Sequence, residues 1–103
     1  MAYGKALHCL SDPTRREVFE RLRSGPQSVG ALARGLPVSR PAVSQHLAVL
    51  RSVGLVTLGR AGRENRYRLC REPLEDIRHW LGQLDEFWAQ RLAGLREHLD
   101  ANP

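Results

Sequence analysis

The chain has 103 residues, 42% of them hydrophobic, and carries 16 lysines and arginines against 11 aspartates and glutamates. This length indicates one domain over residues 1–103, and so small a domain has a thin core with little room for a catalytic pocket. The ordinary hydrophobic content excludes a disordered chain, and no apolar run approaches the ~18 residues that a membrane span needs. We therefore expect a globular protein that is not an enzyme and has no membrane partner.

The net charge of +5 is unevenly distributed along the chain. Residues 1–72 hold 13 basic and 5 acidic residues, whereas residues 73–103 hold 3 basic and 6 acidic ones. The basic part favours a polyanionic partner. Of the 16 cations, 15 are arginines, which form a planar fork on phosphate or guanine, although a G+C-rich genome would also enrich arginine.

The start of the chain lacks the charged and then apolar layout of a signal peptide. The two cysteines, Cys9 and Cys70, lie far apart in the sequence and form no C-x-x-C motif. No disulfide framework is indicated, and we expect a cytoplasmic protein.

Apolar residues at helical spacing predict three helices before residue 36. The first spans residues 3–10. The second begins with Asp12 as N-cap and Pro13 as first helical residue, and runs to about residue 24. The third is expected over about residues 28–35, and the residues "GLPV" form the turn after it.

The stretch "SRPAVSQHLAVLRSVG" predicts a fourth helix, with Ser39 as N-cap, Pro41 in the first turn and Gly54 just beyond its end. Its apolar side chains recur at i, i+4 and i+7 and must face the core. These are Val43, Leu47 and Leu50. The opposite face carries Arg40, Pro41, Ser44, Gln45, Ala48 and Arg51.

Small hydrogen-bonding side chains on that opposite face allow the helix to approach a groove floor. Ser, Gln and Arg side chains read base edges in the major groove, and the methylenes of Pro41 can contact a thymine methyl. The helix N-terminus also offers backbone N–H groups to a phosphate. The pattern therefore favours a DNA-reading helix over an ordinary solvated surface.

The segment "LVTLGRAGRENRYRLC" predicts two strands, whose turn exposes Arg60, Arg63 and Arg66. Two helices joined by a four-residue turn and followed by a basic hairpin form a winged helix-turn-helix. We therefore expect a mostly α protein of about five helices with a small β-hairpin, whose wing lies on the flanking minor groove or phosphates.

A last helix is expected over about residues 73–100, with a continuous apolar stripe. The stripe consists of Leu74, Ile77, Leu81, Leu84, Trp88, Leu92, Leu95 and Leu99, widened by Trp80 and Phe87. Such a helix spans ~42 Å, whereas a body of the preceding size should be about 25–30 Å across. The far end of the stripe needs a second surface, which favours an isologous homodimer. The expected dimer residues are Tyr3, Leu7, Leu10, Leu81, Leu84, Trp88, Leu92 and Leu95.

The motifs "LSDPTRREVFERL", "SVGALARGLPVSRPAVSQHLAVLRSVGLV" and "GRENRYRL" resemble the ArsR/SmtB family of bacterial winged-helix repressors, over about residues 5–95. The resemblance implies a homodimer that binds a two-fold symmetric operator in double-stranded DNA and usually represses transcription. It also assigns DNA-contacting roles by position. These fall on Ser39, Arg40, Pro41, Ser44 and Gln45 at the recognition positions, His46 at or beside the DNA backbone, and Arg63 in the wing.

Metal-sensing members of that family carry a Cys-x-Cys motif in the region that matches "SVGALARGL", which has no cysteine. Others carry paired Asp-x-His and His-x-x-Glu ligands on the last helix, where this chain has Asp76, His79 and His98 at different spacings. The chain therefore resembles the non-metal, autorepressor-like branch, for which no metal or other cofactor is expected.

Four alternatives stay open at this point. A metal-responsive repressor would need histidines from two chains, because His46 has no second ligand within helical reach and His79 and His98 lie roughly 28 Å apart. A thiol-responsive repressor would need a lowered cysteine pKa, and Arg68 and Arg71 do flank Cys70. A non-specific architectural DNA-binding protein fits the short polar face of the fourth helix less well. A winged helix that binds protein alone fits the basic charge of residues 1–72 less well.

Overall fold

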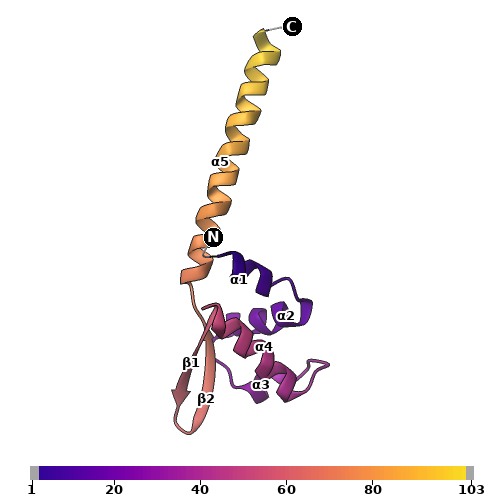
Figure 1. The fold of residues 1–103 in the computed structure, drawn as a ribbon, viewed down its shortest axis with the longest axis vertical. Helices are drawn as coiled ribbons and strands as arrows, with labels where there is room; N and C mark the ends of the chain where they lie inside the picture. The colour runs from indigo at the N-terminus through magenta and orange to yellow at the C-terminus, as the bar shows by residue number, and fades with distance from the viewer. Residues whose placement is uncertain (1–2, 102–103) are drawn as a thin grey trace.

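The computed structural model describes residues 3–101 as a helical body with a β-hairpin and one projecting helix (Figure 1). The elements are α1 (Gly4–Cys9), α2 (Pro13–Arg21), a 3-10 turn (Leu22–Ser24), α3 (Val29–Ala33), α4 (Arg40–Ser52), β1 (Val56–Ala61), β2 (Glu64–Leu69) and α5 (Glu72–Ala101). The expected winged helix-turn-helix, mostly α with a small hairpin, is confirmed.

Local capping explains where the helices begin. The carboxylate of Asp12 accepts a hydrogen bond from the Arg15 backbone N–H at 3.0 Å, and Pro13 opens α2. The hydroxyl of Ser39 accepts a hydrogen bond from the Ala42 backbone N–H at 3.3 Å and so caps α4. These contacts satisfy donors that have no partner within the helix.

Two helix ends differ from the predicted ones. The predicted helix to about residue 24 changes to 3-10 geometry after Arg21, as is common in a last turn. The third helix ends at Ala33 instead of about residue 35, because the backbone of Arg34 is already extended at ψ 128°. The end of α4 agrees with the prediction, since Gly54 follows the C-cap with φ 80°, the left-handed conformation that glycine favours.

The core lies where α4 packs against α2 and α3. Val43, Leu47 and Leu50 are all 0% exposed, as their spacing predicts. The side chains that surround them are also buried, and they include Val18, Phe19, Leu22, Leu32, Leu36, Leu55 and Val56. This packing fixes the rotation of α4 about its own axis and therefore decides which side chains it exposes.

The hairpin pairs β1 with β2 in antiparallel register from Val56 opposite Leu69 to Ala61 opposite Glu64. Gly62 has φ 64°, the positive value that a type II′ turn requires at its first central position. The backbone of Gln27 exchanges hydrogen bonds of 3.0 and 2.8 Å with that of Tyr67. The hairpin is thereby attached to the segment that precedes α3.

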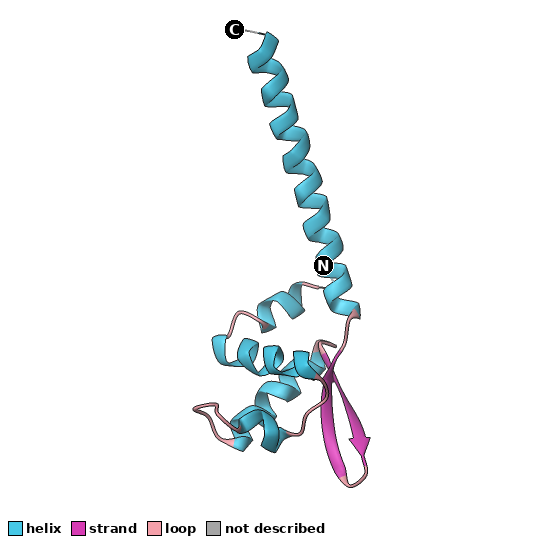
Figure 2. Cartoon of the chain, turned by 180° about the vertical axis from the view of Figure 1, so that it is seen from behind, coloured by secondary structure: helices cyan, strands magenta, loops and turns pink. Residues whose placement is uncertain are grey.

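Within residues 3–101, the contacts of the last helix with the body lie near its start. Ile77 is 9% exposed, Leu74 packs against the core, and the rings of Tyr3 and Trp80 lie 5.8 Å apart. Beyond that point α5 projects from the body (Figure 2), and the protein measures 69 × 25 × 23 Å. None of the described helices is long and apolar enough to cross a membrane.

Candidate nucleic-acid interface

The predicted reading face of α4 is exposed. Ser39, Arg40, Pro41, Ser44 and Gln45 all lie open to solvent on the side opposite the buried leucines and valine. They come from the cap and the first two turns of α4, so the structure brings these side chains together in one patch. Ala48 continues the same exposed face. The patch presents hydrogen-bonding groups of the kind that read base edges.

His46 differs from its neighbours in being half-buried. The Arg15 backbone N–H is the main cause that lowers the pKa of Asp12, and the charge of His46 lowers it further. His46 is therefore near enough to the start of α2 for its charge to act on Asp12. It stands at the edge of the predicted reading face.

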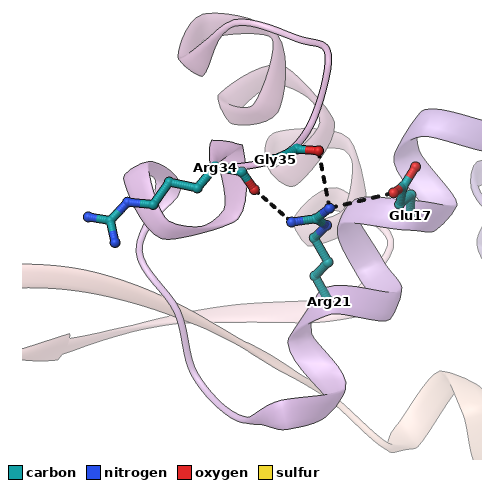
Figure 3. A network of polar contacts seen from close by, with 4 residues as sticks. All are labelled: Glu17, Arg21, Arg34 and Gly35. Atoms are coloured by element: carbon teal, nitrogen blue, oxygen red, sulfur yellow. Dashed lines mark hydrogen bonds and ion pairs between the residues drawn. The ribbon is translucent and has the colours of Figure 1, made fainter.

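The turn between α3 and α4 is held by an arginine that the sequence patterns did not single out (Figure 3). One Nη of Arg21 donates to the carbonyl of Arg34 at 2.7 Å, and the other lies 3.5 Å from the carbonyl of Gly35. Glu17, one turn earlier on α2, lies 3.7 Å from the same guanidinium. Carbonyls at a helix end lack partners within the helix, so Arg21 links α2 to the turn that leads into α4.

The wing arginines Arg60, Arg63 and Arg66 are exposed, as predicted. Arg66 also has an ion pair, since its Nε lies 3.2 Å from a carboxylate oxygen of Glu64. Arg68 was not among the predicted contacts, although the strand register puts it on the same face as Arg66. Arg60, Arg66 and Arg68 line a cleft of about 350 Å³ together with Pro26, Gly59 and Ala61.

Arg51 lies apart from the other predicted DNA contacts. It occupies the last turn of α4 and lines a cleft of about 570 Å³ at the base of the hairpin, with Arg68, Cys70, Arg71 and Glu72. The wing turn is at the opposite end of the same strands. The structure therefore does not group Arg51 with the reading patch.

The predicted dimer residues divide into two groups. Leu81, Leu84, Trp88, Leu92 and Leu95 are between 37% and 62% exposed, and Leu99 is 60% exposed. On the first helix Leu7 is 36% exposed, whereas Tyr3 and Leu10 pack partly against the core of their own chain. The far part of α5 thus has an apolar face without cover among residues 3–101.

The described residues contain no group of three or more His, Cys, Asp or Glu side chains placed to hold a metal ion. Cys9 is 3% exposed, and burial raises the pKa of its thiol although the nearby Arg15 opposes that shift. A raised pKa disfavours the reactive thiolate. Cys70 is half-buried.

Comparison with known proteins agrees with this geometry. Residues 10–59 match a family described as a helix-turn-helix domain, a range that contains α2, α3 and α4. The HTH-type transcriptional regulator Rv2034 of Mycobacterium tuberculosis is 46% identical over 97 residues, which cover 94% of this chain and 88% of that protein.

Two further similarities extend the comparison. The HTH-type transcriptional repressor SmtB of Mycobacterium tuberculosis is 41% identical over 76 residues, 74% of this chain and 56% of the relative. Among solved structures, the ArsR-like transcriptional regulator from Rhodococcus sp. RHA1 has a TM-score of 0.80 and 36% identity, over 93% of this chain and 91% of that one.

Proposed function

We propose, from the premise that this chain belongs to the ArsR/SmtB family of DNA-binding transcriptional repressors, that it represses as a homodimer on a two-fold symmetric operator. The resemblance seen in the sequence motifs is thereby confirmed at the level of the family. The matched proteins are transcriptional regulators, and DNA binding and repression follow from membership.

The observation that carries the proposal is the division of α4 into two faces. One face is completely buried, so the helix cannot rotate, and the other presents small polar side chains and Arg40 to solvent. In our proposal α4 enters the major groove, where Ser44, Gln45 and Arg40 read base edges. The exposed arginines of the hairpin lie along the flanking backbone or minor groove, where they add affinity without sequence information.

The homodimer is supported by the continuity of the α5 stripe. Leu74 and Ile77 of this stripe are covered by the body, whereas Trp88 and Leu92 are 60% and 62% exposed. Long, contiguous apolar patches are uncommon on the surface of monomeric proteins and mark interaction sites. A second α5 presents the same stripe, so the two helices can cover each other in an isologous contact.

Selection of binding sites from a random DNA pool tests this proposal with the whole protein. We expect enriched sites with two inverted half-sites, centred roughly 34 Å or one helical turn apart, and two chains per DNA in a titration. Enrichment of a single unrepeated half-site, or of no sequence at all, would reject the two-fold operator and favour architectural binding.

Single substitutions test the reading residues separately from the wing. Arg40→Ala or Gln45→Ala should each cost about 1–3 kcal/mol on the selected operator while barely changing affinity for random DNA at the same salt concentration. Equal losses on both DNAs would show that these side chains do not read bases.

We place the chain in the non-metal branch of the family, and we leave a thiol response as the rival. Elemental analysis of protein purified without chelator detects a metal-responsive repressor. Operator titration before and after a thiol oxidant detects a thiol-responsive one. Stoichiometric metal, or operator affinity that changes with oxidation, would contradict the placement.

A further inference from the structure

Gly30 lies inside α3, a place where glycine weakens a helix. Its φ is not in the positive region, and α3 runs from Val29 to Ala33 around it. Glycine in a helix is less favourable than alanine, because it loses more backbone freedom on folding. The backbone geometry therefore gives no reason for a glycine here, and the reason must lie in what surrounds it.

The space that a side chain at Gly30 would fill is occupied by Arg40. A Cβ built on Gly30 would lie 2.9 Å from Nη2, 3.2 Å from Cζ and 3.7 Å from Nε of the Arg40 guanidinium. The first of these distances is shorter than non-bonded carbon contacts allow. The guanidinium of the first residue of α4 thus lies directly against the bare backbone of α3.

The Arg40 head group lies close to the Gly30 backbone and makes no polar contact with the described part of the chain. Among the described residues the guanidinium has neither a hydrogen bond nor an ion pair, although the residue is exposed. The guanidinium therefore lies against α3 while its donors stay available to an outside acceptor. A group at the end of a flexible side chain can also be displaced without disturbing the fold.

We propose that Gly30 is a positioning residue for DNA reading. Because it has no side chain, it leaves space against α3 in which the Arg40 guanidinium is oriented. The proposal rests on the proposed function, in which Arg40 reads the operator. A methyl group at position 30 would displace the guanidinium from α3. The Arg40 side chain would then have more conformations in the free protein, and it would lose more of them on binding a base. The free protein would lose pre-organisation while its fold gained helix stability.

Gly30→Ala should therefore change stability and operator binding in opposite directions. We expect a Tm higher by about 2–5 °C, from the helix preference of alanine. We expect operator affinity lower by about two- to tenfold, the effect of freeing one long side chain, with affinity for random DNA unchanged. A role in folding alone would not lower operator affinity in a more stable protein.

Gly82→Ala is the matched control. Gly82 is a helical glycine with nothing within 4 Å of its added Cβ, and it neighbours the polar side chains Glu75, Arg78, His79, Gln83 and Glu86. This variant should also raise the Tm, and it should leave operator affinity unchanged.

A double-mutant cycle with Arg40→Ala identifies the source of any loss. If Gly30 acts through Arg40, Gly30→Ala should weaken operator binding in the wild-type background and have no effect once Arg40 is alanine. A loss that persists in the Arg40→Ala background would mean that the new methyl group clashes with DNA directly, and it would overturn the proposal. So would unchanged operator affinity for Gly30→Ala.

The same cycle distinguishes failure of this proposal from failure of the proposed function. If Arg40→Ala alone leaves operator affinity unchanged, Arg40 is not a reader and both proposals about it are wrong. If Arg40→Ala weakens binding and Gly30→Ala does not, only the role of Gly30 is rejected. Should Gly30→Ala lower the Tm, the double variant, which removes the crowding, must restore it.

Discussion

The helices α4 and α5 have the same sequence signature and opposite surroundings. Each has apolar side chains at three- and four-residue steps. In α4 the members Val43, Leu47 and Leu50 are 0% exposed, whereas in α5 the members Leu92 and Leu99 are 62% and 60% exposed. Helical periodicity therefore identifies an apolar face, but it does not say which surface covers that face.

The difference follows from the position of each helix. Four segments of the same chain surround α4, since α1, α2, α3 and β1 all pack against it. The helix α5 begins at Glu72, at the edge of the body, and extends beyond it, so that the protein is 69 Å long and only 25 × 23 Å across. In our proposal the α4 stripe stabilises the single chain and the α5 stripe stabilises the proposed dimer.

The largest expected effect comes from Leu92→Glu. In the proposed dimer this change buries an unpaired carboxylate at a cost of several kcal/mol, whereas in a monomer the site is exposed and the cost is small. We expect light scattering to show a monomer and operator titration on the same sample to show near non-specific affinity.

Gln83→Glu adds the same charge to α5 beside Arg78 and His79, leaves every leucine of the apolar stripe in place, and serves as the control. It should stay dimeric and bind the operator normally. A Leu92→Glu variant that remains dimeric, or a monomer with wild-type affinity, would break the link between α5 and DNA binding.

Leu47→Ala sharpens the other side of the comparison. Truncation of this fully buried side chain should lower the free energy of unfolding by about 2–5 kcal/mol, because it removes buried surface and leaves a cavity. Denaturant unfolding should show this loss. The loss should be similar at low and high protein concentration, whereas the loss from Leu92→Ala should be seen mainly at concentrations where the wild type is dimeric. The same concentration dependence for both variants would refute the division.

A smaller effect is expected from Arg21→Met, which removes the link to the turn before α4 and keeps an unbranched stem. Loss of its hydrogen bonds should cost about 1–2 kcal/mol of stability and speed amide exchange at Leu36 and Val38. Arg23→Met removes the same charge, but Arg23 pairs with Glu20 at 3.1 Å and not with the turn. Equal exchange rates in the two variants would show that Arg21 does not hold the turn.

Arg63→Ala should weaken binding to all DNA sequences without altering the dimer. If Arg63 contacts a phosphate, the slope of log affinity against log salt should become shallower by about one. Fluorescence anisotropy with operator and random DNA across a salt series measures both. An unchanged slope would remove Arg63 from the phosphate contacts.

The smallest effect concerns acid. The Arg15 backbone N–H, together with the charges of His46 and Arg15, lowers the pKa of Asp12 from its ordinary value of 3.8. A lowered folded-state pKa stabilises the protein above the unfolded-state value, and this contribution disappears as the pH falls through the folded-state value. Thermal melts of Asp12→Asn should therefore lose less stability than wild type below about pH 4. Parallel melting curves in acid would contradict this.

Most of the fold was predictable from local chemistry. Asp12, Ser39 and Gly54 begin or end helices because their own side chains or backbone preferences satisfy groups at helix termini. Val43, Leu47 and Leu50 were assigned to the core from spacing alone. The contacts of Arg21 with Arg34 and Gly35 could not be predicted, because they join residues 13 and 14 positions apart through the packing of two helices.

The reading face of α4 was likewise determined by the sequence, since a helix with one buried face has only one face left to expose. The tertiary structure decided how exposed the side chains on and beside that face are, and where the long ones lie. It half-buries His46 at the meeting of α4 with α2, places Arg51 near the base of the hairpin, and sets the Arg40 guanidinium against Gly30. Sequence alone specifies helices and faces, because these depend on neighbours within four residues. The angles between helices, which decide where long side chains end, depend on the packing of the whole core.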